Sequence, residues 1–400
     1  MRILLLNQYF PPDTSATAKM AQTVVDALSS LHEVIVLCGR PSYDPTQRRP
    51  WRLWQSESVD KVRILRVGSS TFPRFKMLQR VLNYLSYTGL AVPIALFLRC
   101  DLVLAMTDPP FAGIAGAWVA ALKRKPYVYN IRDLYPDMAL GGSLVRPGLL
   151  SRIWERMHRW ALRRATRVIV LGQDMQARIV RKSVPPSRVV VVRDGVDLPP
   201  SDVPLRLNGD VIRKIRGDFP FVILHAGNLG FYGDWNTLLE AAKLLAADDV
   251  QLVFVGDGAQ RSALQAKANG AHNIRFLDFF PASQIPSVLA APDMHVITIL
   301  EGLDGVVVPS KMYGILAAGK PIVAVAPTAT DAATLGAKQG FSCCVPPGDT
   351  QGLVALLRRL SREPAEVERM SRAARAAAPD YDRFSELQKF VQVVEEARLA

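Results

Sequence analysis

The sequence lacks the features that mark membrane-spanning, disulfide-bonded and phosphate-loop proteins. No stretch holds the roughly eighteen consecutive apolar residues that a membrane-spanning helix requires. Its four cysteines show neither a CxxC pair nor a metal-ligand spacing, which is typical of buried thiols in a reducing cytosol. No G-x-G-x-x-G follows the first apolar segment and no G-x-x-x-x-G-K-[ST] occurs. These absences argue against a dinucleotide-dependent oxidoreductase and a P-loop nucleotidase.

The N-terminal residues do not favour a signal peptide. The apolar run Ile3–Leu6 follows Arg2, but the polar and proline-bearing segment 7–12 ends it, and no small-residue cleavage site follows. We therefore interpret residues 2–6 as the first strand of a globular domain.

Charge is distributed unevenly between the two halves of the chain. Residues 1–200 hold 29 Lys and Arg against 14 Asp and Glu, and residues 201–400 hold 20 against 22, which gives net charges of +15 and −2. A basic half joined to a nearly neutral half predicts an anionic partner for the first half, such as nucleic acid, anionic lipid or a phosphorylated substrate.

Short apolar segments alternate with helical patterns along the whole chain. Such alternation is typical of parallel sheets with helices on both faces. The turn residues at 194–200 and the polar segment 201–217 interrupt it, and we place a domain boundary there. The sequence thus predicts an α/β protein with two Rossmann-like doubly wound domains, 1–200 and 201–400, whose sheets present their carboxyl ends to a central cleft. Two amphipathic helices, 365–377 and 384–399, end the chain, and the last is expected to pack back on the N-terminal domain.

One segment of the second half, 301–321, has the pattern of an anion site. The acidic loop residues Glu301 and Asp304 precede three β-branched residues and then Pro309-Ser310-Lys311. Proline is tolerated in the first helical turn and glycine after an apolar run ends a helix, so the pattern predicts a helix over 309–318. A helix N-terminus beside a hydroxyl and an ammonium suits a phosphate group. A capped helix with a solvated lysine has the same pattern.

Glycine turns follow two predicted strands of the second half. Gly227-Asn228-Leu229-Gly230 follows the strand 221–226, and Gly256-Asp257-Gly258 follows the strand 251–255. Such turns allow a nucleotide to approach the backbone closely, although glycine also ends many ordinary strands of this type.

The order of these motifs resembles the retaining GT-B glycosyltransferases of family 4. The segments that carry the resemblance are N-Q-Y-F-P-P (7–12), D-L-Y-P-D (133–137), V-V-R-D-G-V-D (191–197), H-A-G-N-L-G (225–230), V-G-D-G (255–258) and P-S-K-M-Y-G-I-L-A-A-G-K-P (309–321). Within that family the chain looks most like bacterial enzymes that build O-antigen, capsule or exopolysaccharide units on a lipid carrier.

The resemblance implies an enzyme that transfers a sugar, with retention, from a nucleotide-diphosphate donor, with a UDP-sugar favoured. It implies no cofactor and no metal, and it places the donor on the C-terminal domain and a lipid-linked or glycan acceptor on the N-terminal domain. The implied donor-binding residues are Gly227, Asn228, Gly230, Gly256, Asp257, Phe280, Glu301, Asp304, Ser310 and Lys311. Lys311 would also act in catalysis, by neutralising the leaving diphosphate. Phe280 would present backbone to the base, or else serve only as a hydrophobic contact.

The chain departs from the family pattern at the ribose. Relatives carry two glutamates seven residues apart in this region, and Gly314 stands where the second is expected. Glu301 or Asp304 would take the place of the first. The basic residues that many relatives place after the Gly-Asn-Leu-Gly turn are replaced by Phe231-Tyr232-Gly233-Asp234, so the neutralisation of phosphate would depend on Lys311.

On the acceptor side, Asp133 is the principal candidate. It follows the apolar strand 127–131, and the carboxyl end of a parallel strand is where such folds bind ligands. It would orient the acceptor or sugar, and a helix-capping role is the alternative. Arg132 beside it and Asp13 in the Pro11-Pro12 loop are further candidates for the acceptor side. His158 and His225 are interpreted as packing residues.

Two segments predict contact with an anionic membrane surface. Residues 73–99 carry Arg74, Lys76 and Arg80 ahead of an apolar remainder, and residues 149–167 place six arginines among Trp, Ile, Met and Leu. Cationic residues beside Trp and Leu suit an anionic lipid interface, whereas a scaffold helix with a solvated basic face is the alternative for the second segment. We therefore expect a cytoplasmic protein, peripheral on the inner face of the cell membrane.

Two other functions fit part of the sequence. An enzyme like UDP-N-acetylglucosamine 2-epimerase shares the two-domain architecture, but it has no lipid-linked acceptor to attract, and a neutral N-terminal half would have favoured it. A nucleic-acid-binding protein would use the basic surplus, but no RNP-like strand or helix-turn-helix pattern is present. We therefore expect no nucleic-acid partner.

Overall fold

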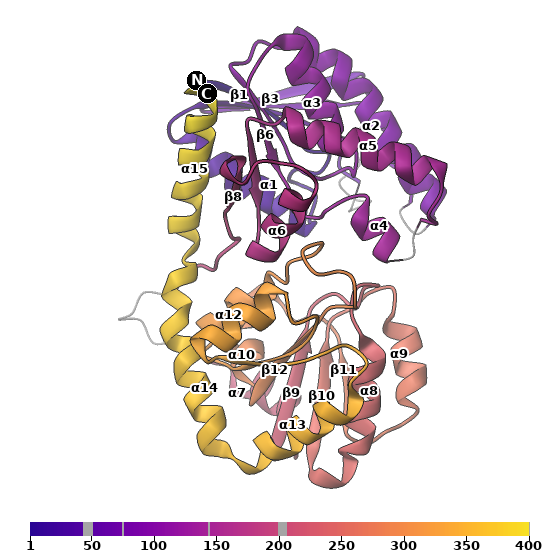
Figure 1. The fold of residues 1–400 in the computed structure, drawn as a ribbon, viewed down its shortest axis with the longest axis vertical. Helices are drawn as coiled ribbons and strands as arrows, with labels where there is room; N and C mark the ends of the chain where they lie inside the picture. Colours follow the sequence, from indigo (N-terminus) through magenta and orange to yellow (C-terminus); the bar gives the residue numbers. More distant parts are fainter. Residues whose placement is uncertain (43–50, 74–75, 143–144, 199–205, 400) are drawn as a thin grey trace. The chain divides into compact units, whose positions relative to one another are not determined.

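The computed structural model describes residues 1–42, 51–73, 76–142, 145–198 and 206–399 (Figure 1). The chain divides into two compact units, Met1–Val192 with Leu387–Ala400, and Arg193–Glu386. The boundary predicted at residue 200 lies outside the described residues, and the division falls slightly earlier. Arg74, one of the cations predicted to face the membrane, also lies outside the described residues.

The first unit is built on an eight-stranded sheet of order β3-β4-β2-β1-β5-β6-β7-β8. All neighbouring pairs are parallel except β3 with β4. The strands are β1 (Arg2–Leu6), β2 (Glu33–Cys38), β3 (Trp54–Val59), β4 (Val62–Val67), β5 (Leu102–Ala105), β6 (Tyr127–Asn130), β7 (Arg167–Val170) and β8 (Val189–Val191). The helices are α1 (Ala16–Ser29), α2 (Met77–Phe97), α3 (Ala112–Lys123), α4 (Asp137–Gly141), α5 (Leu149–Arg164) and α6 (Gln173–Arg181).

Helices cover both faces of this sheet, because its central strands are apolar on both sides. On one face, α1 and the final helix α15 (Arg383–Leu399) bury Val24, Leu28, Phe390 and Val394 against β1, β2 and β5. On the other face α3 lies directly on the sheet. A Cβ atom at its Gly113 would lie 2.0 Å from the Tyr129 ring, so glycine is required for this close approach.

The second unit is a six-stranded parallel sheet of order β11-β10-β9-β12-β13-β14. Its strands are β9 (Phe221–Ala226), β10 (Val250–Val255), β11 (Ile274–Leu277), β12 (Met294–Thr298), β13 (Ile322–Val325) and β14 (Ser342–Val345). Its helices are α7 (Gly209–Arg216), α8 (Trp235–Leu244), α9 (Arg261–Ala268), α10 (Ile285–Ala290), α11 (Lys311–Ala317), α12 (Asp331–Gln339), α13 (Thr350–Arg362) and α14 (Pro364–Ala377). The reversal of strand order at β9 and β12 is the switch point at which such sheets bind ligands, outside the carboxyl ends of the strands.

The sequence-based description of this unit needs two corrections. The polar segment 201–217 is not only a linker, because α7 occupies its second part, where Val211 and Ile215 are buried against the sheet. The helix predicted over 309–318 is shorter. It runs from Lys311 to Ala317, and Ser310 holds the N-cap position without a side-chain capping bond.

Candidate functional site

The centre of the candidate site in the second unit is a contact between Lys311 and His225. Lys311 begins α11 and His225 lies near the end of β9. The lysine Nζ lies 3.1 Å from the histidine Nε2. His225 is buried, with its ring edge-on to Trp235 at a centroid distance of 4.8 Å. The two residues therefore meet at the switch point of the sheet.

Burial changes the protonation of both groups. It lowers the pKa of His225 well below the usual value, and the neighbouring Lys311 lowers it further, so the imidazole is neutral and can accept a hydrogen bond. Burial, which disfavours the charged form, also lowers the pKa of Lys311 to about 7. Among the described residues no carboxylate pairs with this lysine, and a partly exposed cation in this position is suited to an incoming anion.

The glycine turns after β9 and β10 pack against each other beside this lysine. A Cβ atom at Gly227 would lie 3.3 Å from the Lys311 Nζ, and one at Gly256 would lie 2.1 Å from the Gly227 carbonyl oxygen. A Cβ atom at Gly258 would lie 2.5 Å from the Asn228 Oδ1. Both Gly227 and Gly256 also have positive φ. The glycines are thus needed for the packing of the turns, and Gly227 leaves room for the lysine.

The remaining predicted donor residues surround these turns to different degrees. Gly230 accepts a hydrogen bond from the Trp235 indole at 2.7 Å, and the Asp257 carboxylate accepts one from the Gly258 N–H at 2.8 Å. Glu301 and Ser310 are exposed and Asp304 is partly exposed, all three between β12 and α11. The structure therefore brings Gly227 and Lys311 into contact, whereas it leaves Glu301 and Ser310 in solvent.

The two adjacent phenylalanines after β11 point to different surroundings. The Phe280 ring packs at the core beneath α7, with the Lys214 ammonium 5.5 Å from its centroid. Phe279 is 62% exposed, and its ring lies 3.3 Å from the Cβ position of Gly256. Phe279, which precedes the candidate Phe280 in the predicted segment 279–281, is therefore the aromatic residue beside the glycine turns.

Gly314 stands where the second glutamate of the family is expected, and few atoms lie near its Cβ position. A Cβ atom at Gly314 would meet only the Leu289 Cδ1, at 3.4 Å, which is ordinary contact. Packing around the Cβ position therefore does not require a glycine here.

In the first unit, Asp133 lies in the loop between β6 and α4. It does not cap α4, because that helix begins at Asp137 and its N-cap residue is Pro136. Asp133 lies close enough to Tyr135 to act with burial in raising the pKa of that phenol, and Asp108 and Tyr84 act in the same direction. The candidate carboxylate therefore lies in a cluster with residues from the loops after β5 and β6 and from α2.

The other acceptor-side candidates have structural contacts. Asp13 is buried, and its Oδ1 accepts a hydrogen bond from the Ser42 N–H at 2.8 Å. Arg132 is partly buried next to Asp133. The second aspartate of the D-L-Y-P-D motif, Asp137, pairs with Lys182 at 2.7 Å and with Arg178 at 3.0 Å. Asp137 is therefore occupied in holding α4 to α6.

The described residues offer neither a metal site nor a membrane span. They contain no group of three or more His, Cys, Asp or Glu side chains placed to hold a metal ion. None of their helices combines the length and the hydropathy needed to cross a membrane.

Comparisons with known proteins agree with this arrangement. Residues 15–195 match the model of a glycosyl transferase 4-like domain, and residues 220–363 match that of glycosyl transferases group 1. The glycosyltransferase WbjE of Pseudomonas aeruginosa is 25% identical over 74% of each chain. WcaI of Escherichia coli strain K12, named as a colanic acid biosynthesis glycosyl transferase, is 24% identical over 90% of this chain and 92% of its own.

Solved structures show the same fold over almost the full length. HepE of Anabaena, solved in complex with UDP, superposes with a TM-score of 0.68 at 19% identity, covering 99% of this chain and all of its own. WaaG, a glycosyltransferase involved in lipopolysaccharide biosynthesis, superposes with a TM-score of 0.66 at 15% identity, covering 98% and 99%. These structures confirm the predicted GT-B fold, and the domain matches give no support to the epimerase-like or nucleic-acid-binding alternatives.

Proposed function

The chain belongs to the glycosyltransferases that join a 4-like domain to a group 1 domain, and from this we propose that it transfers a sugar from a UDP-linked donor to a lipid-linked or glycan acceptor. The product would be part of a cell-surface polysaccharide. The names of WcaI and WaaG support this last step, and the UDP and UDP-glucose complexes of HepE support the donor.

The observation that carries the proposal is the cation at the switch point of the second sheet. The Lys311 ammonium lies beside the Gly227 turn and has the neutral His225 as its hydrogen-bond partner. A donor diphosphate bound along this turn would supply the missing negative charge. As the bond to the sugar breaks, charge develops on the same phosphate oxygens, so the lysine would stabilise the leaving group more strongly than the substrate.

We expect transfer with retention, in which the acceptor hydroxyl attacks from the face that the leaving group departs. The departing phosphate can then take the proton of that hydroxyl, and no protein base is required. Asp133, at the carboxyl edge of the first sheet, would orient the acceptor or the sugar. The absence of a ribose carboxylate at Gly314 leaves Phe279 and the backbone of the glycine turns to hold the nucleoside.

Exposed apolar side chains on two helices of the first unit support a peripheral membrane location on the cytoplasmic face. On α5, Leu149 and Leu150 are 71% and 82% exposed, next to the exposed Arg152 and Arg156. On α2, Leu78 is 71% exposed while the opposite side of the helix is buried. Apolar side chains beside cations suit an anionic lipid surface that carries a lipid-linked acceptor.

A panel of sugar nucleotides screened by thermal denaturation tests the donor assignment. A ligand that binds only the native state raises the melting temperature by mass action. We expect UDP and at least one UDP-sugar to raise it, and GDP and TDP to raise it less. A protein whose melting temperature responds to none of these nucleotides would not be a sugar-nucleotide transferase.

A further inference from the structure

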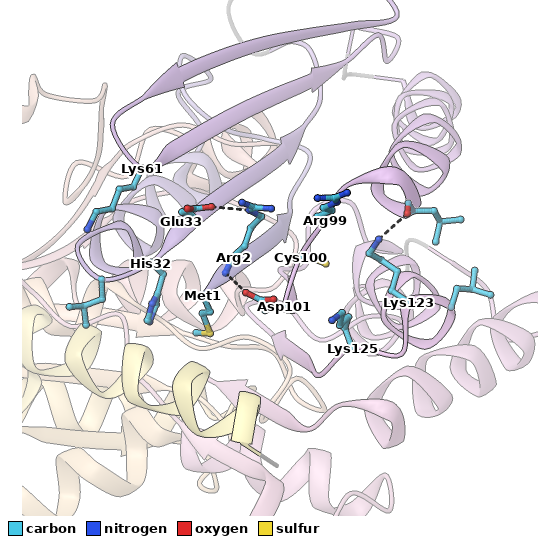
Figure 2. A pocket seen from close by; sticks show the side chains of 13 residues that line it. Met1, Arg2, His32, Glu33, Lys61, Arg99, Cys100, Asp101, Lys123 and Lys125 are labelled. Carbon is cyan, nitrogen blue, oxygen red and sulfur yellow. Dashed lines mark hydrogen bonds and ion pairs between the residues drawn. The ribbon is translucent and has the colours of Figure 1, made fainter.

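A second basic site lies in the first unit, at the edge of the sheet opposite to the carboxyl ends of the strands. It is a cavity of about 1150 Å³ where residues at the starts of β1, β2, β5 and β6 meet. Figure 2 shows Arg99, Lys123 and Lys125 together on one side of it, with His32 and Lys61 across from them. The proposed transfer reaction uses none of these residues.

The cavity carries a surplus of positive charge. Five Lys and Arg side chains line it against two carboxylates, Glu33 and Asp101. Both carboxylates are engaged, since Glu33 pairs with the Arg2 guanidinium at 2.9 Å and Asp101 accepts the Arg2 backbone N–H at 2.7 Å. The hydrogen bond from Arg2 lowers the pKa of Asp101, so this carboxylate is already ionised in the neutral range.

Three of the five cations have partners within the fold. Arg2 pairs with Glu33. The Lys123 Nζ donates to the Leu96 carbonyl at 2.8 Å, near the end of α2, and the Lys61 Nζ donates to the Ser30 carbonyl at 3.0 Å, just past α1. Cations are favoured at the carboxyl ends of helices, where carbonyl groups lack partners. These two lysines therefore have a structural role.

Arg99 and Lys125 differ from these three cations. Among the described residues, neither side chain forms a hydrogen bond or an ion pair, although both line the cavity. Arg99 follows α2 directly and Lys125 precedes β6, so adjacent elements of the sheet fix their backbones. A concave surface lined by one sign of charge concentrates the field and attracts counter-ions. Exposed leucines at positions 31 and 122 lie on the same lining and add an apolar surface.

We propose that this cavity binds a phosphorylated ligand, with Arg99 and Lys125 contacting its phosphate oxygens. Phosphate is favoured over a single carboxylate because two unpaired cations, one with the fork geometry of guanidinium, match a group with several anionic oxygens. The volume exceeds that of a phosphate ion and admits a larger group attached to it. The same chemistry is offered by a soluble phosphate ester and by the headgroup of an anionic lipid.

The test uses the full chain with saturating UDP, which fills the proposed donor site before the second ligand is added. Pyrophosphate is titrated by calorimetry, and binding to phosphatidylcholine vesicles with and without phosphatidic acid is measured by flotation. The double variant Arg99→Ser/Lys125→Ser is compared with Arg188→Ser/Lys389→Ser, which removes the same two residue types from exposed positions of this unit outside the cavity.

We expect the cavity variant to lose at least tenfold in affinity for one probe while the control keeps its affinity. Loss for pyrophosphate identifies a soluble phosphorylated ligand, and loss for phosphatidic acid vesicles alone identifies a lipid headgroup. Hydrogen exchange should show protection at residues 96–101 and 122–126 on binding. Equal loss in the two variants, or affinities unchanged by the cavity variant, would overturn the proposal. Because UDP binding is measured first, a failed donor assignment is recognised separately.

Discussion

The Nζ of Lys311 and the Nε2 of His225 lie 3.1 Å apart, although the two residues are 86 positions apart in the chain. When the lysine is an ammonium, this nitrogen of the imidazole must be the unprotonated one, so the pair fixes the tautomer of the histidine. The histidine thereby holds the lysine at the Gly227 turn without neutralising it.

Replacing Lys311 by alanine should weaken UDP binding and sugar transfer together. Loss of a charge-assisted hydrogen bond to phosphate costs about 1.5–3 kcal/mol. The protein should remain folded, because removal of a cation without a carboxylate partner leaves no unpaired anion. Calorimetry with UDP measures the effect, and the exposed Lys338→Ala provides the control. Unchanged UDP affinity in the Lys311 variant would remove this residue from the donor site.

The affinity for UDP should fall as the pH rises above neutral. Because the pKa of Lys311 is about 7, the free protein loses this proton near neutral pH. The bound diphosphate favours the charged lysine and raises its pKa, so binding takes up a proton above the free pKa, and affinity falls by up to about tenfold per pH unit. Titrations of UDP binding from pH 6 to 9 measure the slope. Lys311→Arg, which stays charged, should show a flatter profile, and identical slopes would contradict the account.

Replacing Asp133 by asparagine should reduce transfer by roughly 10²-fold while UDP affinity stays the same, since an orienting group acts on the reacting geometry. The melting temperature should change little, because Asp133 does not cap α4. Turnover, UDP affinity and melting temperature are measured on one preparation. A folded variant with full turnover would exclude Asp133 from the site.

Binding to anionic vesicles should depend on the exposed face of α5. The variant Leu149→Ser/Leu150→Ser/Arg152→Ser/Arg156→Ser removes the two most exposed leucines and two exposed cations of α5. Co-sedimentation with anionic vesicles should fall in the variant, and in the wild type it should fall with added salt because surface charges are screened. UDP affinity is the control for folding. Equal sedimentation of the wild type with neutral and anionic vesicles would refute the membrane location.

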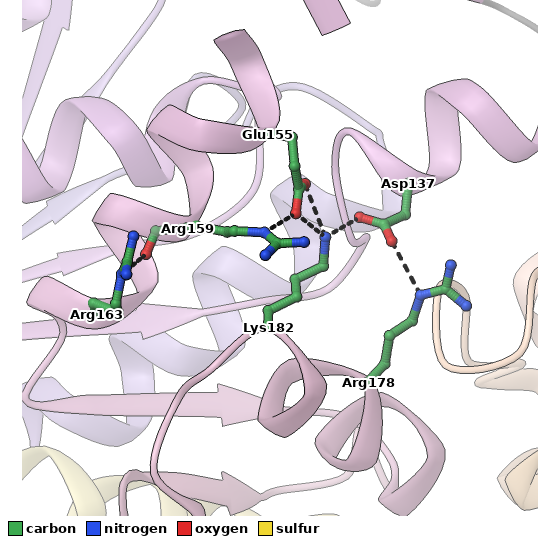
Figure 3. Close-up of polar contacts among 6 residues, drawn as sticks. All are labelled: Asp137, Glu155, Arg159, Arg163, Arg178 and Lys182. Atoms are coloured by element: carbon green, nitrogen blue, oxygen red, sulfur yellow. Dashed lines mark hydrogen bonds and ion pairs between the residues drawn. The ribbon is translucent and has the colours of Figure 1, made fainter. Parts of the chain in front are cut away.

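Replacing Lys182 by methionine should destabilise the first unit. Lys182 is buried between Asp137 at 2.7 Å and Glu155 at 2.8 Å, while Arg178 and Arg159 pair with the same two carboxylates (Figure 3). Burial is the largest single influence on the pKa of Asp137 and raises it, but the Lys182 ammonium and the Arg178 guanidinium together outweigh burial and lower this pKa.

Removing the shared cation leaves Asp137 with Arg178 alone and Glu155 with Arg159 alone, so we expect a cost of at most about 3 kcal/mol, the low end for a broken buried pair. Urea denaturation gives the free energy of unfolding, with the exposed Lys338→Met as control. A midpoint equal to that of the wild type would show that the network contributes nothing.

The sequence predicted the parallel strands well, because strands buried on both faces are continuously apolar. It did not predict β3, whose sequence W-Q-S-E-S-V is polar and largely exposed at the sheet edge. It also missed α7, whose charged residues conceal two buried apolar positions, Val211 and Ile215. β3 is held by backbone pairing with the adjacent β4, and α7 packs against α10, which is distant in sequence. The periodicity of side chains within one segment reveals neither contact.

The local pattern of a sequence indicates only part of the candidate site. The segment Pro309-Ser310-Lys311 made Lys311 a candidate from local pattern alone, and its role in donor binding stays a prediction. His225 was interpreted as a packing residue, and it does pack on Trp235, but its bond to Lys311 depends on the sheet bringing β9 next to the start of α11. Which of Phe279 and Phe280 lies beside the glycine turns depends on the direction of each side chain. The sequence does not determine that direction for two adjacent residues after a strand.

The last helix has a consequence for biosynthesis. Phe390, Val393, Val394 and Ala397 of α15 complete the core of the first unit, although more than 180 residues of the second unit are translated in between. The first unit therefore emerges from the ribosome with an uncovered apolar strip along β1, β2 and α1. This strip stays open to chaperones, or to a neighbouring nascent chain, until the final residues have been synthesised.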